Sequence, residues 1–501
     1  MNLHRRTCAA LAAAFIVATL AAPAAQAQSR KDSVVLGMVL EPTGLDPTTG
    51  AAAAIGEIVH YNVLEGLTKI SVDGAVSPLL ASDWASEPDG RSYTFKLRKG
   101  VKFQDGTPFD SSVVKWNFER AKAEGSTNKA KKVVFDNISS IATPSPDVVI
   151  LTLNSADGTF PFRLGENTAV MLSPKSAATA NTQPVGTGPF KLDSWQKGTA
   201  VTLVKWDDFR DAAAIKLKRV SFRFINDPAA QVAALLAGDI DGMPRFGAVQ
   251  NLKQFQGDKR FAVEMGSTAG KGIMTINNQR KPFDDVRVRR ALMHAIDRKA
   301  FIAGVLEGLA TPIGSHAAPN ELGYVDLTGL YPYDPEKAKA LLKEAGVATP
   351  LNVTLTLPPP QYARKGGEVV AAMLAKVGVV AKIENVEWAQ WLSGTFKGNF
   401  DLTIINHVEP LDFVQYTNPQ YYWGYNNPAF NTLVKKMAES PKGPPRVKLY
   451  GDIQRQLATD AVNAYIFNPA QVAVSRKGLK GLWASSPIFA NDMAGVSWAA
   501  P

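Results

Sequence analysis

The sequence contains almost no cysteine, since Cys8 is the only one among its 501 residues. Beyond that position there is no thiol to form a disulfide, a thiolate metal site or a cysteine nucleophile. The five histidines are dispersed, and the HExxH, CxxC and EF-hand patterns are absent. A G-x-S-x-G nucleophile elbow is also absent. We therefore expect no bound metal, no cofactor and no catalytic activity.

Clustered charge is also missing. The formal net charge is +10, yet lysine and arginine are scattered along the chain and form no long basic run. Nucleic-acid-binding proteins usually concentrate basic residues on one face or helix. The charge pattern therefore predicts that nucleic acid is not a partner.

Long apolar runs are absent after the N-terminus. Arg5 and Arg6 precede a small and apolar run from Ala9 to Ala22, and Ala25-Gln26-Ala27 follows. This order is typical of a cleaved signal peptide, here residues 1–27, because the run is short for a membrane span and ends at an A-x-A site. The alternative is an N-terminal membrane anchor. Because Cys8 precedes the apolar run, we expect no lipid anchor and a monomeric protein free in a Gram-negative periplasm.

Strand and helix signals alternate through the remaining chain, which predicts an α/β protein. Its length of more than 450 residues predicts two or three lobes. Expected strands include 34–39, 92–97, 351–357 and 379–383. Asp-Pro pairs at 227–228 and 334–335, with glycines at 238 and 346, mark the starts and ends of two helices.

Two features that suggest chemistry have simpler structural interpretations. The segment GSTAGKG at 266–272 resembles a phosphate loop, but its glycine spacing is one residue short and Gly272 replaces the Ser or Thr that would hold magnesium. Strand-like runs flank the segment, so we expect a hairpin turn. The acid pairs Asp239/Asp241 and Asp284/Asp285 lie at a helix exit and a helix start, where capping explains them without catalysis.

Eight segments together carry a resemblance to a known family. They are, in order, EPTGLDP, VLEGL, PLLASDW, DGRSYTFKLRKGVKFQDGTPF, PVGTGPFKL, AALLAGDID, FDDVRVRRALMHAIDR and DPEKAKALLKEAG. In this order the chain resembles the dipeptide- and oligopeptide-binding proteins of ABC importers, solute-binding family 5. The resemblance implies a type II periplasmic-binding-protein fold, with the ligand held in the cleft between two lobes. Lobe I would comprise residues 28–278 and 469–501, with an extra subdomain at about 73–183, and lobe II residues 279–468.

The resemblance also implies candidate ligand-binding residues. ARKGGEVVAAMLAKVGV aligns with a helix of dipeptide-binding relatives and places Arg364 on their carboxylate-binding arginine. A guanidinium can hold a carboxylate through two parallel hydrogen bonds. The alternative is a solvated arginine near a helix start. Trp388 and Trp391, three residues apart, match a cleft-lining aromatic segment, although buried core tryptophans would give the same pattern.

The segment FDLTIINHVEPLDF departs from the family pattern. Relatives carry an aspartate here that pairs with the α-amine of the ligand, and this chain has no clear counterpart. His407, Glu409 and Asp412 are the candidates, and Glu409 or Asp412 could pair with an ammonium. Both acids could instead face water.

The expected function is capture of a peptide or related amine–carboxylate solute for a membrane permease. A non-peptide solute, such as an opine, a sugar or a metal complex, is the alternative within the same class. An extracytoplasmic chaperone or an enzyme on the same scaffold is the alternative from another class.

Overall fold

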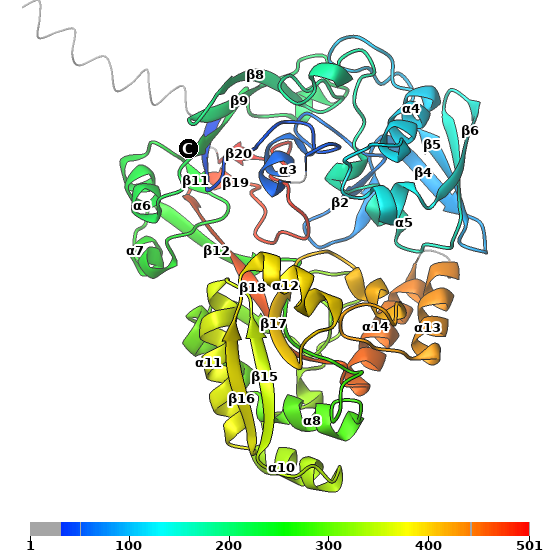
Figure 1. The fold of residues 1–501 in the computed structure, drawn as a ribbon. Helices are drawn as coiled ribbons and strands as arrows, with labels where there is room; N and C mark the ends of the chain where they lie inside the picture. The colour runs from blue at the N-terminus through cyan, green and yellow to red at the C-terminus, as the bar shows by residue number, and fades with distance from the viewer. Residues whose placement is uncertain (1–31, 51, 441–442, 500–501) are drawn as a thin grey trace, which may run out of the picture.

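The computed structural model describes residues 32–50, 52–440 and 443–499. The predicted signal peptide, residues 1–27, lies outside the described residues. Two lobes make up the molecule, and the chain crosses between them directly after β12 (Phe261–Ser267) and within β18 (Asn463–Arg476) (Figure 1). The prediction of a two-lobed α/β fold is confirmed. None of the helices in the described residues has the length and hydropathy needed to cross a membrane.

Lobe I is built on a mixed sheet with strand order β18-β11-β1-β10-β9-β8, in which β12 also pairs with β18. In β1 the side chains of Val34, Leu36 and Met38 point to the same face of the sheet, and all three are buried in the core. Helices α6 and α7 lie beside this sheet in Figure 1. The bounds are β1 Ser33–Met38, α3 Ala53–Val59, β8 Phe190–Gln196, β9 Ala200–Lys205, β10 Arg219–Phe224, α6 Pro228–Ala237, β11 Gly242–Met243, α7 Leu252–Gln256, β19 Leu479–Lys480 and β20 Ser497–Trp498.

A subdomain extends from lobe I and has its own hydrophobic core. It contains a four-stranded antiparallel sheet of order β4-β5-β7-β6, with α4 packed against β6 and β7. Buried Phe95, Phe118 and Phe135 belong to this core. The bounds are β2 Thr68–Ile70, β3 Val76–Pro78, β4 Ala81–Ser86, β5 Ser92–Leu97, α4 Ser111–Lys122, η2 Lys131–Phe135, β6 Ile138–Ser145, β7 Val148–Leu153, α5 Phe160–Arg163, η3 Asn167–Ala169 and η4 Ala177–Thr179.

Lobe II contains the sheet β16-β15-β17-β13-β18, with β14 also paired to β18. The parallel strands β15 and β16 end at the edge where α12 faces lobe I (Figure 1). The bounds are β13 Lys271–Ile276, α8 Val286–Ala295, α9 Arg298–Leu306, β14 Ala310–Pro312, α10 Pro335–Glu344, β15 Leu351–Leu357, α11 Gln361–Ala375, β16 Val379–Asn385, α12 Trp388–Ser393, β17 Leu402–His407, η9 Asp412–Thr417, α13 Pro428–Glu439 and α14 Pro444–Thr459.

The crossover between the lobes corrects two predictions. β12 and β13 do not pair with each other as a hairpin, because both pair with β18, one in each lobe. The GSTAGKG segment therefore contains a lobe-to-lobe crossover at residues 268–270, and the predicted hairpin turn is wrong. β13 pairs with β17 and β18 in lobe II, so the boundary expected at residue 278 lies too late. Within β18, the partner changes from β14 to β12 between Pro469 and Ala470.

The predicted helix caps are present. The Asp227 side chain accepts a hydrogen bond from the Ala230 N–H, and Gly238 adopts the left-handed conformation that ends α6. Asp334 and Asp285 cap α10 and α8 through their carboxylates. The Asp284/Asp285 pair thus has the structural role expected of a helix start.

Candidate functional site

A cavity of about 540 Å³ lies between the lobes, at the crossover. The crossover itself contributes Thr268, Ala269, Gly270 and Pro469 to the lining. Lobe I supplies most of the remaining wall, and lobe II supplies Asn406 on β17 and the segment that follows this strand. A second cavity of about 380 Å³ shares Pro410 and Pro487 with the first, so the two are adjacent compartments of one interlobe cleft.

Five charged residues line the main cavity, and the two arginines among them are already paired. Arg163 lies 3.3 Å from the carboxylate of Glu166. Arg245 lies 2.9 Å from Glu57 and donates a hydrogen bond to Ser486. The remaining two, Lys129 on lobe I and Glu409 on lobe II, form no ion pair among the described residues. Each lobe therefore presents one unpaired charge, of opposite sign.

Glu409 is positioned by its main chain and leaves its carboxylate at the cleft. Its carbonyl oxygen accepts a 2.6 Å hydrogen bond from the Lys271 ammonium. Its side chain is exposed, and Oε2 accepts a hydrogen bond from the neighbouring Val408 N–H, at 3.2 Å. Of the acids predicted in this segment, Glu409 is thus the one that lines the main cavity.

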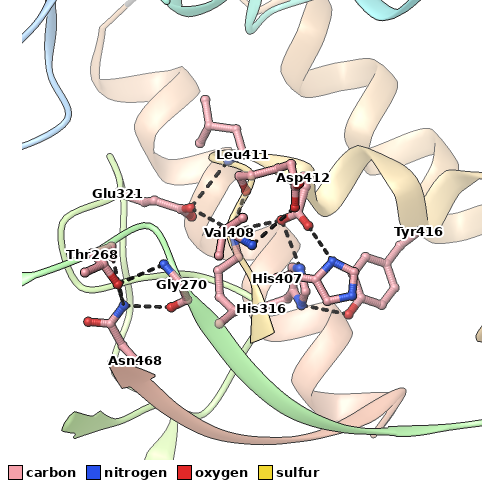
Figure 2. Close-up of polar contacts among 12 residues, drawn as sticks. Thr268, Gly270, His316, Glu321, His407, Val408, Leu411, Asp412, Tyr416 and Asn468 are labelled. Atoms are coloured by element: carbon pink, nitrogen blue, oxygen red, sulfur yellow. Dashed lines mark hydrogen bonds and ion pairs between the residues drawn. The ribbon is translucent and has the colours of Figure 1, made fainter. Parts of the chain in front are cut away.

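Asp412 lies behind the cleft in a buried network (Figure 2). Its Oδ1 is 3.0 Å from the Lys271 ammonium and 2.9 Å from His316 Nε2, while Oδ2 is 3.1 Å from His407 Nδ1. Lys271 has a fully buried side chain and is also 3.3 Å from Glu321. Asp412 is buried and does not face water, so the alternative of a water-facing loop acid does not hold for this residue. His407 is likewise engaged, with its Nε2 2.8 Å from the Tyr422 hydroxyl.

Burial and mutual charge set the protonation of this network. Burial opposes ionisation of Lys271, but the carboxylates of Asp412 and Glu321 raise its pKa. Burial alone would also raise the pKa of Asp412, yet His316 and Lys271 hold it well below its usual range. Burial raises the pKa of Glu321 and lowers that of His316 to about 4. The ammonium–carboxylate pair of Lys271 and Asp412 is therefore the charged centre of the network.

His316, His407 and Asp412 are the one group of potential metal ligands that the structure brings together in its described residues. The donor set would suit a transition metal. However, the Lys271 ammonium already lies 3.0 Å from Asp412 and supplies the cation that this carboxylate requires. The free ring nitrogens are also used, because Tyr416 and Tyr422 hydroxyls lie 2.9 and 2.8 Å from His316 Nδ1 and His407 Nε2. These residues fit a structural hydrogen-bond network better than a metal centre.

The other predicted residues lie at the edge of lobe II that faces lobe I, but do not line the main cavity. Arg364, on α11, has a side chain that is 41% exposed and donates to Glu387 at 3.0 Å. Trp388 is 41% exposed on α12. Trp391 is buried, and its indole N–H donates to the Thr403 hydroxyl at 3.1 Å. Trp391 therefore occupies the core, as the structural alternative expected.

Sequence reasoning missed Lys271 and the crossover. In the sequence Lys271 belongs to a segment that resembles a phosphate loop, and this pattern predicts no buried ion pair for it. A signal was available, because a lysine between two glycines and two apolar runs is an unusual residue to bury. Its carboxylate partners Glu321 and Asp412 are distant in sequence, so spacing alone could not reveal the pairing.

The two lobes, the paired crossovers and the cavity between them define a two-lobed solute-binding protein. Residues 75–428 match the family model for bacterial extracellular solute-binding proteins, family 5. The chain belongs to this family.

Curated relatives match over most of their length. The chain is 29% identical over 434 residues to heme-binding protein A of Haemophilus influenzae, covering 79% of each chain. It is 27% identical over 490 residues to the dipeptide-binding protein of Escherichia coli K12, covering 88% of this chain and 90% of the relative.

Solved structures include AgaA of A. tumefaciens R10 in complex with agropinic acid, at 25% identity and a TM-score of 0.72, covering 94% of this chain and 99% of that chain. The unliganded open form of the murein tripeptide-binding protein MppA has a higher TM-score of 0.82, at 22% identity, covering 93% and 97%.

Proposed function

We propose that the protein is the periplasmic binding component of an ABC importer and captures a peptide or a related amine–carboxylate solute. In this proposal the protein binds its ligand without catalysing a reaction and delivers it to a membrane permease. The observation that carries it is the interlobe cavity, which is lined from both lobes and from the crossover that joins them. A ligand in this position contacts both lobes at once and so favours their closure.

Charge supports an amine-bearing ligand. The exposed carboxylate of Glu409 has no cation partner among the described residues and can accept hydrogen bonds from an ammonium. Arg364 is the proposed partner for a carboxylate, as in the dipeptide-binding proteins that the chain resembles. It lies at the lobe edge, where it forms an ion pair with the exposed Glu387. Exposed pairs of this kind contribute little to stability, so a ligand carboxylate can replace Glu387 at low cost.

Thermal-shift measurements on the purified mature protein test this function. The panel consists of the dipeptide Ala-Phe, trialanine, agropinic acid, hemin and maltose. Ligand at a hundredfold excess over its dissociation constant stabilises the fold by about 2.7 kcal/mol, so a cognate class raises the melting temperature. A shift with agropinic acid, hemin or maltose and none with the peptides would refute the peptide assignment.

Two variants then test the proposed charges by calorimetry. Arg364→Ala weakens binding of a carboxylate ligand by about 2–5 kcal/mol if the arginine is desolvated against it on closure. Glu409→Gln keeps the shape of the side chain and weakens Ala-Phe but not N-acetyl-Ala-Phe, which lacks the amine. Wild-type affinity in Arg364→Ala removes that residue from the site, and equal losses for both ligands in Glu409→Gln exclude an amine contact.

A further inference from the structure

Three residues that line the main cavity carry buried polar atoms that have no hydrogen-bond partner within the described part of the chain. They are His60, through both ring nitrogens, Thr168, through Oγ1, and Asn406, through Oδ1. His60 and Thr168 belong to lobe I and are 0% and 3% exposed, and Asn406 lies on β17 of lobe II. Buried polar atoms are nearly always paired in folded proteins, because an unpaired one is destabilising. Three such residues around one cavity point to a partner that arrives from outside.

His60 is held by its surroundings as a neutral imidazole. It follows α3 directly and stacks on Tyr61 with ring centroids 3.9 Å apart. Burial lowers its pKa to about 3, and the positive charge of Lys69 acts in the same direction. The nearby Gly165 carbonyl acts in the opposite direction and raises the pKa of His60. It does not meet the geometry of a hydrogen bond with the His60 ring, and it accepts one from the Tyr61 hydroxyl at 2.9 Å. At neutral pH the ring therefore offers one N–H donor and one nitrogen acceptor.

Thr168 is fixed by its main chain and leaves its hydroxyl unused. Its carbonyl oxygen accepts a 2.9 Å hydrogen bond from the Asn128 side chain, which ties η3 to the loop after α4. The hydroxyl can both donate and accept, whereas Asn406 Oδ1 can only accept. The main-chain N–H of Asn406 donates to the Tyr362 hydroxyl at 3.1 Å, so this residue is also fixed in place.

We propose that His60 and Thr168 form a subsite for an uncharged amide group of the ligand, with Asn406 as an acceptor on the opposite lobe. An amide offers both an N–H and a carbonyl, which matches the mixed donors and acceptors of these three side chains. A carboxylate only accepts and an ammonium only donates, so each would leave part of the set unpaired. This inference rests on the proposed function, since it assumes that the interlobe cavity is the ligand site.

The experiment uses three variants of the mature protein. Thr168→Val removes the hydroxyl at nearly constant shape, and Thr168→Ser is its matched control because it keeps the hydroxyl. His60→Phe removes both ring nitrogens, and His60→Gln replaces it if the phenylalanine variant does not fold. Calorimetry compares Ala-Phe with its ester analogue alanyl-phenyllactate, and the melting temperature of each unliganded variant is measured in parallel.

Thr168→Val and His60→Phe should each lose about tenfold or more in affinity for Ala-Phe, while Thr168→Ser stays close to wild type. The wild type should prefer the amide over the ester, and Thr168→Val should reduce that preference. The unliganded Thr168→Val variant should melt at the same temperature as the wild type or higher, because an unpaired buried hydroxyl has been removed. A purely structural hydroxyl would give the opposite change in stability.

Wild-type affinity in both Thr168→Val and His60→Phe overturns the subsite. A lower melting temperature of unliganded Thr168→Val, with Thr168→Ser unchanged, overturns it as well and needs no ligand. If agropinic acid or hemin binds and Ala-Phe does not, the peptide assignment fails on its own. The same variants titrated with that probe still decide whether His60 and Thr168 contact the ligand.

Discussion

At the scale of single residues, burial decides the protonation of the groups behind the cleft. His316 is fully buried and contacts Asp412 and Tyr416, and desolvation lowers its pKa to about 4. An unfolded histidine has a pKa near 6.5, so the unfolded chain binds a proton between pH 6.5 and 4 that the folded protein does not bind. The free energy of unfolding must therefore fall as the pH is lowered through this range.

The prediction for His316 follows from this linkage. Between pH 7 and pH 5 the buried neutral ring contributes a loss of about 2 kcal/mol to the free energy of unfolding. His316→Gln lacks the titrating group, so its loss over the same interval should be smaller than that of the wild type by about this amount. Urea denaturation of both proteins at the two pH values measures the difference. Equal losses would show that His316 titrates in the folded protein with the same pKa as in the unfolded chain, and that burial does not lower it.

The sequence predicted the structural roles of some residues but not of others. Capping aspartates such as Asp227 and Asp334 were predictable, because a cap is a local pattern of a few residues. The burial of Asp412 was not predictable, because its partner Lys271 is distant in sequence. For Trp391, the spacing to Trp388 gave the helix face but not whether that face meets the core or the cleft.

At the scale of elements, close packing of the backbone distinguishes the crossover from ordinary helix surface. A Cβ atom on Gly270 would lie 2.8 Å from both Asn406 Oδ1 and Pro469 Cδ, where the two crossover segments meet. On Gly304, inside α9, a Cβ atom would meet nothing within 4 Å. A change from glycine to alanine therefore adds a methyl group to a crowded site at Gly270 and to open space at Gly304.

We expect Gly270→Ala to destabilise the protein by about 1–3 kcal/mol, because the added methyl overpacks the crossover. Gly304→Ala should stabilise it by about 0.5–1 kcal/mol, since glycine within a helix costs more conformational entropy than alanine. Melting temperatures of the two variants beside the wild type measure both effects. A melting temperature of Gly270→Ala at or above that of the wild type would contradict the packing argument.

The alternation of strands and helices was readable from the chain, but the crossover was not. FAVEM and GIMTINN have the composition of a hairpin, and local pattern carries no information on which strand each one pairs with. The pairing is decided by β18, nearly 200 residues later, which accepts β12 in one lobe and β13 in the other. A boundary drawn from the sequence therefore fell on the wrong side of β13.

At the scale of the whole molecule, the cleft exposes apolar surface that closure can bury. Val133 and Phe489 on lobe I are 61% and 39% exposed, and Val408 on lobe II is 41% exposed, and all three line the main cavity. Two crossover segments connect the lobes, so a rotation about residues 268–270 and 468–470 moves one lobe as a unit against the other. Closure on a ligand would remove these side chains from water.

Closure of the cleft over this apolar surface has a consequence that calorimetry can measure. Burial of apolar area on binding gives a negative heat-capacity change, and lobe closure adds protein surface to the area contributed by the ligand itself. Calorimetry of the first probe that raises the melting temperature, repeated at several temperatures, should therefore give a negative heat-capacity change. Val133→Ser removes apolar surface from the lobe I wall, so the heat-capacity change of this variant on binding should be less negative than that of the wild type. Small-angle scattering should show a smaller radius of gyration at saturation. An unchanged radius of gyration with a heat-capacity change near zero would mean that the ligand binds one lobe without closing the cleft.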